Sequence, residues 1–213
     1  PVWSPDGRSI AFSRFREGIF EVAVDGTAAP SLRFPVSDVF FTRQWVDAGI
    51  LYAPVRLLTN SDLLLRTAGG EEIEVDGSAA ISNFGAISPD GRFLAYSSDA
   101  TGRPEIYVRR FPEGRSRWRV TRTGGNAPRW AEGGMELYFQ SDGWVERVQV
   151  RATGERLAFG PTEQRVRLHG PGSLLNGLYD VTEDGTTLAY LEYPESAPPV
   201  LLYMTGLRER LGD

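Results

Sequence analysis

The stretch WSPDGRSIAF at residues 3–12 returns as ISPDGRFLAY at residues 87–96, and the two copies start 84 residues apart. In each copy an Asp-Gly pair separates two apolar runs, and glycine supplies the left-handed backbone conformation that a tight β-turn requires. The preceding proline fixes φ and favours the start of a turn. The stretch therefore predicts a β-hairpin that the chain uses more than once.

Weaker copies of the same stretch occur between and after the two strong ones. WAEGGMELYF at residues 130–139 and VTEDGTTLAY at residues 181–190 align without gaps, and WVDAGILY at residues 45–52 aligns with a two-residue deletion. The ungapped copies share an apolar first residue, a glycine in fifth place, an aliphatic residue in eighth place and an aromatic residue in tenth place. The spacing of 84 residues between the two strong copies is twice 42, and a repeat of about 42 residues is typical of propeller blades.

Two further strand-like runs follow each hairpin, so each repeat is expected to form four antiparallel strands. We expect the third strands at 19–24, 63–67, 105–109, 145–150 and 200–204. We expect the fourth strands near 31–34, 72–75, 117–121, 165–168 and 208–211. The predicted fold is a single all-β propeller domain over residues 1–213, with blades at about 1–36, 37–78, 79–123, 124–172 and 173–213.

The combination of WSPDG, IAF and a strand such as EIYV resembles the TolB-like (WD-repeat-like) β-propeller family. Propellers of this family usually close with six blades, so five repeats imply part of a six-bladed propeller with a blade upstream, or else a five-bladed ring. The segments 87–150 and 200–212 also resemble the C-terminal propellers of bacterial receptor-type serine/threonine kinases and related signalling proteins. Such a resemblance implies an extracytoplasmic location, periplasmic or at the cell surface.

Composition excludes several kinds of chemistry. The chain has no cysteine, which excludes disulfides, thiolate zinc sites and thiol catalysis. It has no lysine, which excludes a P-loop lysine and a Schiff base. There is neither a long apolar run nor a signal peptide, and the net charge of −5 disfavours nucleic acid. We expect no cofactor, no metal, no nucleic-acid partner and no membrane insertion in this segment.

No catalytic motif is evident, so we expect this segment to be non-catalytic; if the parent protein is a kinase, its chemistry lies outside this segment. His169 is the only histidine, and Ser173 nearby lacks the G-x-S-x-G elbow of a nucleophile. The kinase motifs (a Gly-rich loop, H-R-D and D-F-G) are missing from these residues. The turn aspartates Asp6, Asp90 and Asp184 fall one per blade, so they are interpreted as turn residues rather than as one carboxylate site.

An arginine cluster spans residues 103–122, and Arg115, Arg117 and Arg119 alternate along the predicted outer strand of blade three. Charges at this spacing deter edge-to-edge pairing of strands, which is the interpretation we favour. A partner-protein surface and a nucleic-acid site remain the alternatives. Trp3, Trp45 and Trp130 share one repeat position, which predicts packing between adjacent blades rather than a ligand cage.

A ligand is expected at one end of the central channel, because equivalent loops of all blades converge there. The loops that enter the first strands supply Arg43, Asn83, Asn126 and Asn176, with Arg129 further along its strand. The loops between second and third strands supply Arg14, Arg16, Arg56, Asp99, Arg103 and Asp142. This polar rim suits carboxylates or acidic protein segments.

The predicted function is a binding or sensing module for a protein or small-molecule ligand, within a larger bacterial signalling protein such as a serine/threonine kinase. One alternative is a propeller that gates substrate access to a prolyl-oligopeptidase-type hydrolase, and another is a stand-alone propeller enzyme.

Overall fold

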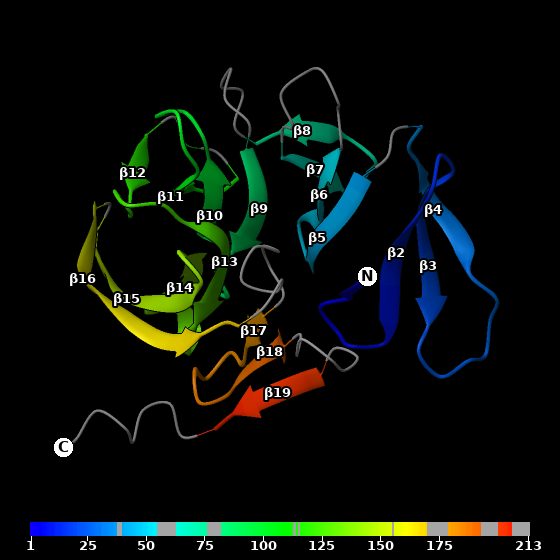
Figure 1. Cartoon of the computed structure of the whole chain (residues 1–213). Helices are drawn as coiled ribbons and strands as arrows, with labels where there is room; N and C mark the ends of the chain where they lie inside the picture. Colours follow the sequence, from blue (N-terminus) through cyan, green and yellow to red (C-terminus); the bar gives the residue numbers. More distant parts are fainter. Residues whose placement is uncertain are drawn as a thin grey trace. The chain divides into compact units, whose positions relative to one another are not determined.

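A computed structural model describes residues 1–37, 40–54, 63–75, 82–112, 114, 116–154, 156–169, 179–192 and 200–205. The chain is an all-β propeller of five antiparallel blades, as the sequence predicts (Figure 1). Blades one to four each have four strands in consecutive order, and the described part of blade five has three. None of the described residues forms a helix that is long and apolar enough to cross a bilayer.

The strands follow the order of the chain within every blade. Blade one contains β1 (Val2–Trp3), β2 (Ser9–Arg14), β3 (Gly18–Ala23) and β4 (Ser31–Pro35). Blade two contains β5 (Phe40–Val46), β6 (Gly49–Pro54), β7 (Leu64–Thr67) and β8 (Glu72–Glu74). Blade three contains β9 (Ser82–Ile87), β10 (Phe93–Ser98), β11 (Glu105–Arg110) and β12 (Arg117–Arg119). Blade four contains β13 (Asn126–Ala131), the 3₁₀ turn η1 (Glu132–Gly134), β14 (Glu136–Ser141), β15 (Trp144–Thr153) and β16 (Arg156–Arg167). Blade five contains β17 (Tyr179–Val181), β18 (Leu188–Glu192) and β19 (Val200–Met204).

The chain divides into two compact units. The first unit comprises Pro1–Gly85 and Ser98–Ala100, and the second comprises Ala86–Ser97 and Thr101–Asp213. Each unit has a core of alternating strand residues, as expected where sheets pack face to face. The core of the first unit includes Ala11, Ile19, Phe40, Ile50, Tyr52 and Leu64. The core of the second unit includes Phe93, Ala95, Ile106, Trp130, Leu137, Phe139 and Val148.

The Asp-Gly turns have the geometry that the repeated sequence predicts. In blade three the Ser88 hydroxyl donates to the Asp90 carboxylate at 2.6 Å, and the Phe93 amide donates to the Ser88 hydroxyl at 3.0 Å. Gly91 has φ +70°, which is the left-handed conformation expected for it. Equivalent hydroxyl–carboxylate pairs close the turns of blade one, Ser4 with Asp6, and of blade five, Thr182 with Asp184. The turn aspartates therefore act as turn residues.

One outer strand is longer than predicted. The sequence places the fourth strand of blade four near 165–168, but β16 runs over Arg156–Arg167 and pairs with the ten-residue β15. The strand contains Gly160 and Pro161, and proline is tolerated there because β16 is the edge of its sheet. The extension buries Leu157 in the core of the second unit and packs Phe159 against it. The fourth strand predicted at 208–211 lies outside the described residues.

The three tryptophans at the shared repeat position do not behave alike. Trp130 is 7% exposed, and its indole nitrogen donates to the carbonyl of Ala86 on β9 at 2.8 Å, so it packs between blades as predicted. Trp45 is half-buried under the guanidinium of Arg33. Trp3 is 58% exposed, which corrects the prediction that it packs between blades. It lies on β1, a strand of only two residues.

Candidate functional site

The sequence places Arg43 and Asn126 in loops that enter the first strands of their blades. In the structure both residues belong to the strands themselves, which corrects that placement. Arg43 lies within β5 at a register shift between Thr42 and Gln44. Asn126 is the first residue of β13, and the register shifts again between Asn126 and Arg129. Such bulges insert a residue and break the inside–outside alternation, so these strand ends read as loops in the sequence.

A left-handed residue accompanies the bulge of β13. Ala127 has φ +52°, and Phe84 at the equivalent place in β9 has φ +51°. The carbonyl of buried Ala127 accepts a hydrogen bond from the Tyr179 hydroxyl at 2.6 Å. The first strand of blade five thereby holds the bulge in place. Bulges of this kind often re-aim a side chain beside a functional site.

A cavity of about 650 Å³ opens beside this bulge in the second unit. Three predicted residues from three different segments line it: Arg103 from the β10–β11 connection, Asn126 from β13 and Asp142 from the β14–β15 turn. The remaining lining residues are Pro104, Thr123, Gly124, Gly125, Gln140, Ser141, Gly143, Arg167 and Leu168. Its volume lies within the usual range for small-molecule pockets, about 300–1,000 Å³.

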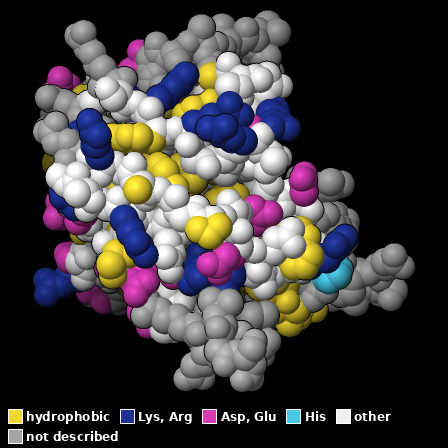
Figure 2. All heavy atoms as spheres, turned by 90° about the vertical axis from the view of Figure 1, so that its left-hand side faces the viewer, with side chains coloured by type: hydrophobic (Ala, Val, Ile, Leu, Met, Phe, Trp, Pro, Cys, Tyr) yellow, Lys and Arg dark blue, Asp and Glu magenta, His cyan; other side chains and the backbone are white. Residues whose placement is uncertain are grey.

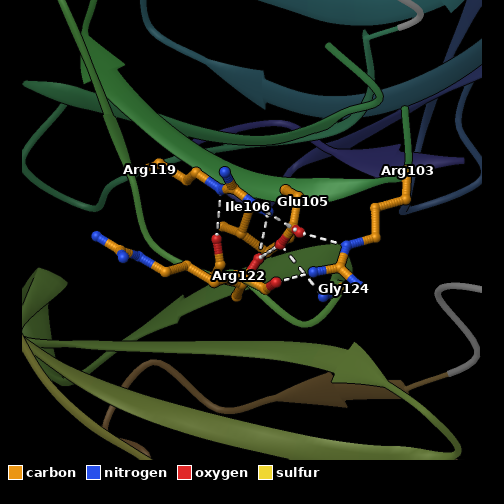
Figure 3. A network of polar contacts seen from close by, with 7 residues as sticks. Arg103, Glu105, Ile106, Arg119, Arg122 and Gly124 are labelled. Carbon is orange, nitrogen blue, oxygen red and sulfur yellow. Dashed lines mark hydrogen bonds and ion pairs between the residues drawn. The ribbon is translucent and has the colours of Figure 1, made fainter. Parts of the chain in front are cut away.

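Glu105 organises one wall of the cavity (Figure 3). It is 0% exposed, and Arg103 and Arg119 donate to its Oε1 at 2.8 and 2.9 Å from opposite sides. Its Oε2 accepts hydrogen bonds from the Thr121 hydroxyl at 2.5 Å and from the Gly124 amide at 3.2 Å. Burial raises the pKa of this carboxyl, but the hydrogen bonds outweigh burial and hold the pKa below its ordinary value. Glu105 is therefore an ionised anchor behind the wall.

Two further charged lining residues, Arg167 and Asp142, have fewer contacts with the described residues. The Arg167 guanidinium lies 5.5 Å from the centre of the Trp144 ring, and the two residues are register partners on β16 and β15. Asp142 lies in the adjacent turn with φ +46°. Burial raises the pKa of nearby Glu146, a hydrogen bond with Gln164 lowers it, and the negative charge of Asp142 raises it further. Arg167 and Asp142 thus present one cation and one anion.

Two other predicted rim residues have structural partners. Arg129 forms an ion pair with Asp180 at 3.4 Å and lies over the Tyr179 ring, so it joins β13 to β17 and does not line the cavity. Arg14, at the end of β2, lies 4.3 Å from the Phe20 ring centre and 3.6 Å from the Glu17 carboxylate.

Arg43 belongs to the first unit, where its guanidinium stacks on Phe84 at 4.4 Å. Arg16 lies in the β2–β3 turn beside the Phe15 ring. Asp99 follows β10 in the β10–β11 connection, and His169 is exposed just after β16. Arg56, Asn176, Ser173 and the side chain of Asn83 lie outside the described residues.

Sequence reasoning missed Thr123, Gln140 and Arg167 as cavity residues. Gln140 is the register partner of Asn126, so a correct strand pairing would have identified it. Arg167 lies on the fourth strand predicted near 165–168, but its place at the cavity depends on its pairing with Trp144 of β15, which the sequence pattern does not show.

A smaller cavity of about 290 Å³ lies in the first unit beside the turns of blades one and two. Its two arginines are already neutralised: Arg33 pairs with Glu21, and Arg66 pairs with Glu72 at 2.8 Å. The other charged residues that line this cavity are the acidic Asp6 and Asp47. The cavity beside Asn126 is the better candidate for a ligand site.

The arginine cluster of blade three is largely committed to its own blade. Arg117 and Arg119 lie on the outer strand β12, where Arg117 covers the Tyr107 ring and Arg119 binds Glu105. Arg115 lies outside the described residues. In Figure 2, which faces this side of the molecule, arginine side chains are scattered among acidic and uncharged ones. This arrangement fits edge protection better than a continuous basic binding surface.

Among the described residues, no group of three or more His, Cys, Asp or Glu side chains could hold a metal ion. No protein-family model matches the chain. No curated protein matches it in sequence.

Solved structures match it in shape. TolB from Acinetobacter baumannii matches with a TM-score of 0.69 and 19% identity, over 95% of this chain and 51% of TolB. A TolB structure from Agrobacterium tumefaciens matches with a TM-score of 0.69 and 16% identity, over 97% of this chain and 76% of that one. A puromycin-hydrolyzing peptidase from Mycobacterium tuberculosis matches with a TM-score of 0.62 and 15% identity, over 96% of this chain and 36% of that one. This chain thus spans about half the length of the first TolB, and it has a TolB-like β-propeller fold.

Proposed function

We propose that this chain is a non-catalytic binding or sensing module that holds a small ligand or a protein segment in the cavity beside Asn126. One observation carries the proposal: Arg103, Asn126 and Asp142 come from three separate segments and line a single cavity. Strand ends and connections on a rigid β-scaffold are the usual place for binding residues. The TolB-like fold is compatible with this role, although fold alone does not decide function.

The parent protein is proposed to be a bacterial signalling protein such as a receptor-type serine/threonine kinase, with this propeller outside the cytoplasm. Support comes from the resemblance of segments 87–150 and 200–212 to propellers of that class. The flanking coding sequence tests this part. A kinase domain and one membrane span upstream would support the proposal, whereas a G-x-S-x-G elbow downstream would contradict it.

The main alternative is a propeller that controls access to a hydrolase. The match to a puromycin-hydrolyzing peptidase favours it, because that longer protein contains a propeller of similar shape. On this alternative the chemistry would lie in a separate domain. Purified chain fused to that domain would then change peptide-size selectivity, which a pure binding module would not do.

The cavity itself is tested by a fragment screen with the 213-residue chain, read by NMR chemical-shift changes. We expect fragments to perturb amides at residues 123–126 and 141–143. Asn126→Ala should weaken such binding, because it removes a lining amide, whereas Arg117→Ala on the outer strand should not. If fragments perturb only β12, or if Arg117→Ala alone abolishes binding, the cavity is not the site.

A further inference from the structure

Two side chains of opposite charge line the cavity without neutralising each other. Within the described part of the chain, Arg167 has no carboxylate within ion-pair distance and only stacks on Trp144. Asp142 likewise has no basic partner there. Arg103, by contrast, already pairs with Glu105. The uncompensated charges are therefore one cation and one anion.

We propose that the cavity binds a short zwitterionic peptide, with its carboxylate at Arg167 and its ammonium group at Asp142. This inference rests on the proposed function, because it names the ligand class of the same site. A purely anionic ligand would satisfy Arg167 but would be repelled by Asp142. A purely cationic ligand would have the opposite conflict, so only a ligand with both charges complements both residues.

The uncharged lining suits the amide groups of a peptide. Asn126 and Gln140 are register partners on β13 and β14, and both line the cavity. The carboxamide of Asn126 makes no hydrogen bond to any described residue. A carboxamide donates and accepts at once, which matches the paired donor and acceptor of a peptide bond. A volume of about 650 Å³ exceeds what a single amino acid fills and leaves room for two or three residues.

Glu105 holds Arg103 in place at the wall of the cavity before a ligand binds. It holds the Nε of Arg103 at 2.8 Å, and Arg103 also donates to the carbonyl of Arg122. A guanidinium has five N–H donors, so a side chain held in this way can still offer donors to a backbone carbonyl of the ligand. Because Arg103 is held in advance, less side-chain entropy is lost when a ligand binds.

The test uses a tripeptide library with free termini and the 213-residue chain at neutral pH and low salt. The tightest member is then compared in four forms: free, N-acetylated, C-amidated and doubly blocked. We expect each block to weaken binding by about tenfold, as for loss of one charge-assisted hydrogen bond. The free amino acid serves as a further arm, and we expect it to bind more weakly than the tripeptide.

Two variants assign the two ends of the ligand. Asp142→Asn should abolish the penalty of N-acetylation while the penalty of amidation remains. Arg167→Gln should abolish the penalty of amidation while that of acetylation remains. Arg151→Gln is the matched control, because Arg151 is an exposed arginine on β15 that does not line the cavity. The control should leave all four affinities unchanged.

The outcomes separate this inference from the proposed function. Equal binding of all four forms, or no tripeptide binding, overturns the zwitterion inference, while fragment hits at the cavity would still support a binding module. Exchanged penalties, with Asp142→Asn removing the effect of amidation, overturn the assigned orientation. Failure of both the fragments and the peptides at the cavity contradicts the proposed function as well.

Discussion

Gly91 closes the turn of blade three with φ +70°, and a Cβ built on it would meet no atom within 4 Å. A side chain there would therefore fit the space but strain the backbone. Gly91→Val should cost about 1–2 kcal/mol in the free energy of unfolding. Gly91→Asn should cost less, because asparagine tolerates the left-handed region. Chemical denaturation measures both, and an unchanged midpoint for the valine variant would contradict the turn assignment.

Because of Glu105, the free energy of unfolding should decrease as the pH is lowered. Its pKa is lowered below the ordinary 4.5, so its ionised network stabilises the fold at neutral pH, and that contribution is lost as the pH falls through and below this value. Glu105→Gln removes the charge and should cost about 1–3 kcal/mol at pH 7. The difference between the native protein and the variant should shrink on acidification. Denaturant titrations across this range measure it, and a constant difference would disprove the assignment.

Sequence reasoning succeeds at residues whose conformation is local. The Asp-Gly turns need one backbone geometry, and that need is visible in five consecutive letters. For Glu105 the sequence predicts only the start of a strand. Its hydrogen-bond partners Arg119 and Thr121 lie 14 and 16 residues away along the chain. Spacing of this kind gives no periodic signal, so the buried anchor could not be predicted.

At the scale of elements, β17 supports the bulge of β13 through one hydroxyl. Tyr179→Phe removes the donor to the Ala127 carbonyl and leaves that buried acceptor unsatisfied. The expected cost is about 1–3 kcal/mol. Tyr107→Phe is the matched control, since Tyr107 is equally buried and its hydroxyl makes no hydrogen bond to a described residue. Thermal unfolding compares the two, and equal losses would mean that the Tyr179 hydroxyl does not stabilise the bulge.

Strand existence was predictable and strand irregularity was not. The third strands agree with their predicted places to within a residue or so in four blades, because alternation marks them. In β15 and β16 the register shifts between Val145 and Glu146 and again between Val148 and Val150. The bulges of β5 and β13 likewise interrupt the alternation of inward and outward side chains. A strand end at a bulge therefore cannot be located from that alternation.

At the scale of the whole molecule, the period of the repeat predicts the number of blades, because each blade needs the same four strands. The candidate site is a harder case. Three of the cavity's polar residues, Arg103, Asn126 and Asp142, were predicted at the ligand-binding rim, since repeats place loop ends together. Arg129 was also among them, but it binds Asp180 instead. A rim residue is available to a ligand only if it has no partner in a neighbouring blade, as Arg129 has in Asp180. Such contacts between blades are not visible in a single sequence.

The five blades should not be equally stable, even though the repeat is regular. The second strands β6, β10 and β14 are buried along their whole length. The second strand of blade one, β2, has only Ala11 buried, although it too pairs with a strand on each side. In repeat folds, stability comes largely from packing between neighbouring units, and local opening follows the number of buried contacts.

We therefore expect β2 amides to exchange with deuterium at least about tenfold faster than those of β6, after correction for intrinsic rates. Both strands lie in the first unit, so the comparison is internal to one compact body. Mass spectrometry of peptides that cover residues 9–14 and 49–54 provides the measurement. Strands β10 and β14 should be as slow as β6, because their burial is the same. Equal protection of β2 and β6 would show that hydrogen bonding within the sheet, rather than packing of its faces, sets the stability of a blade.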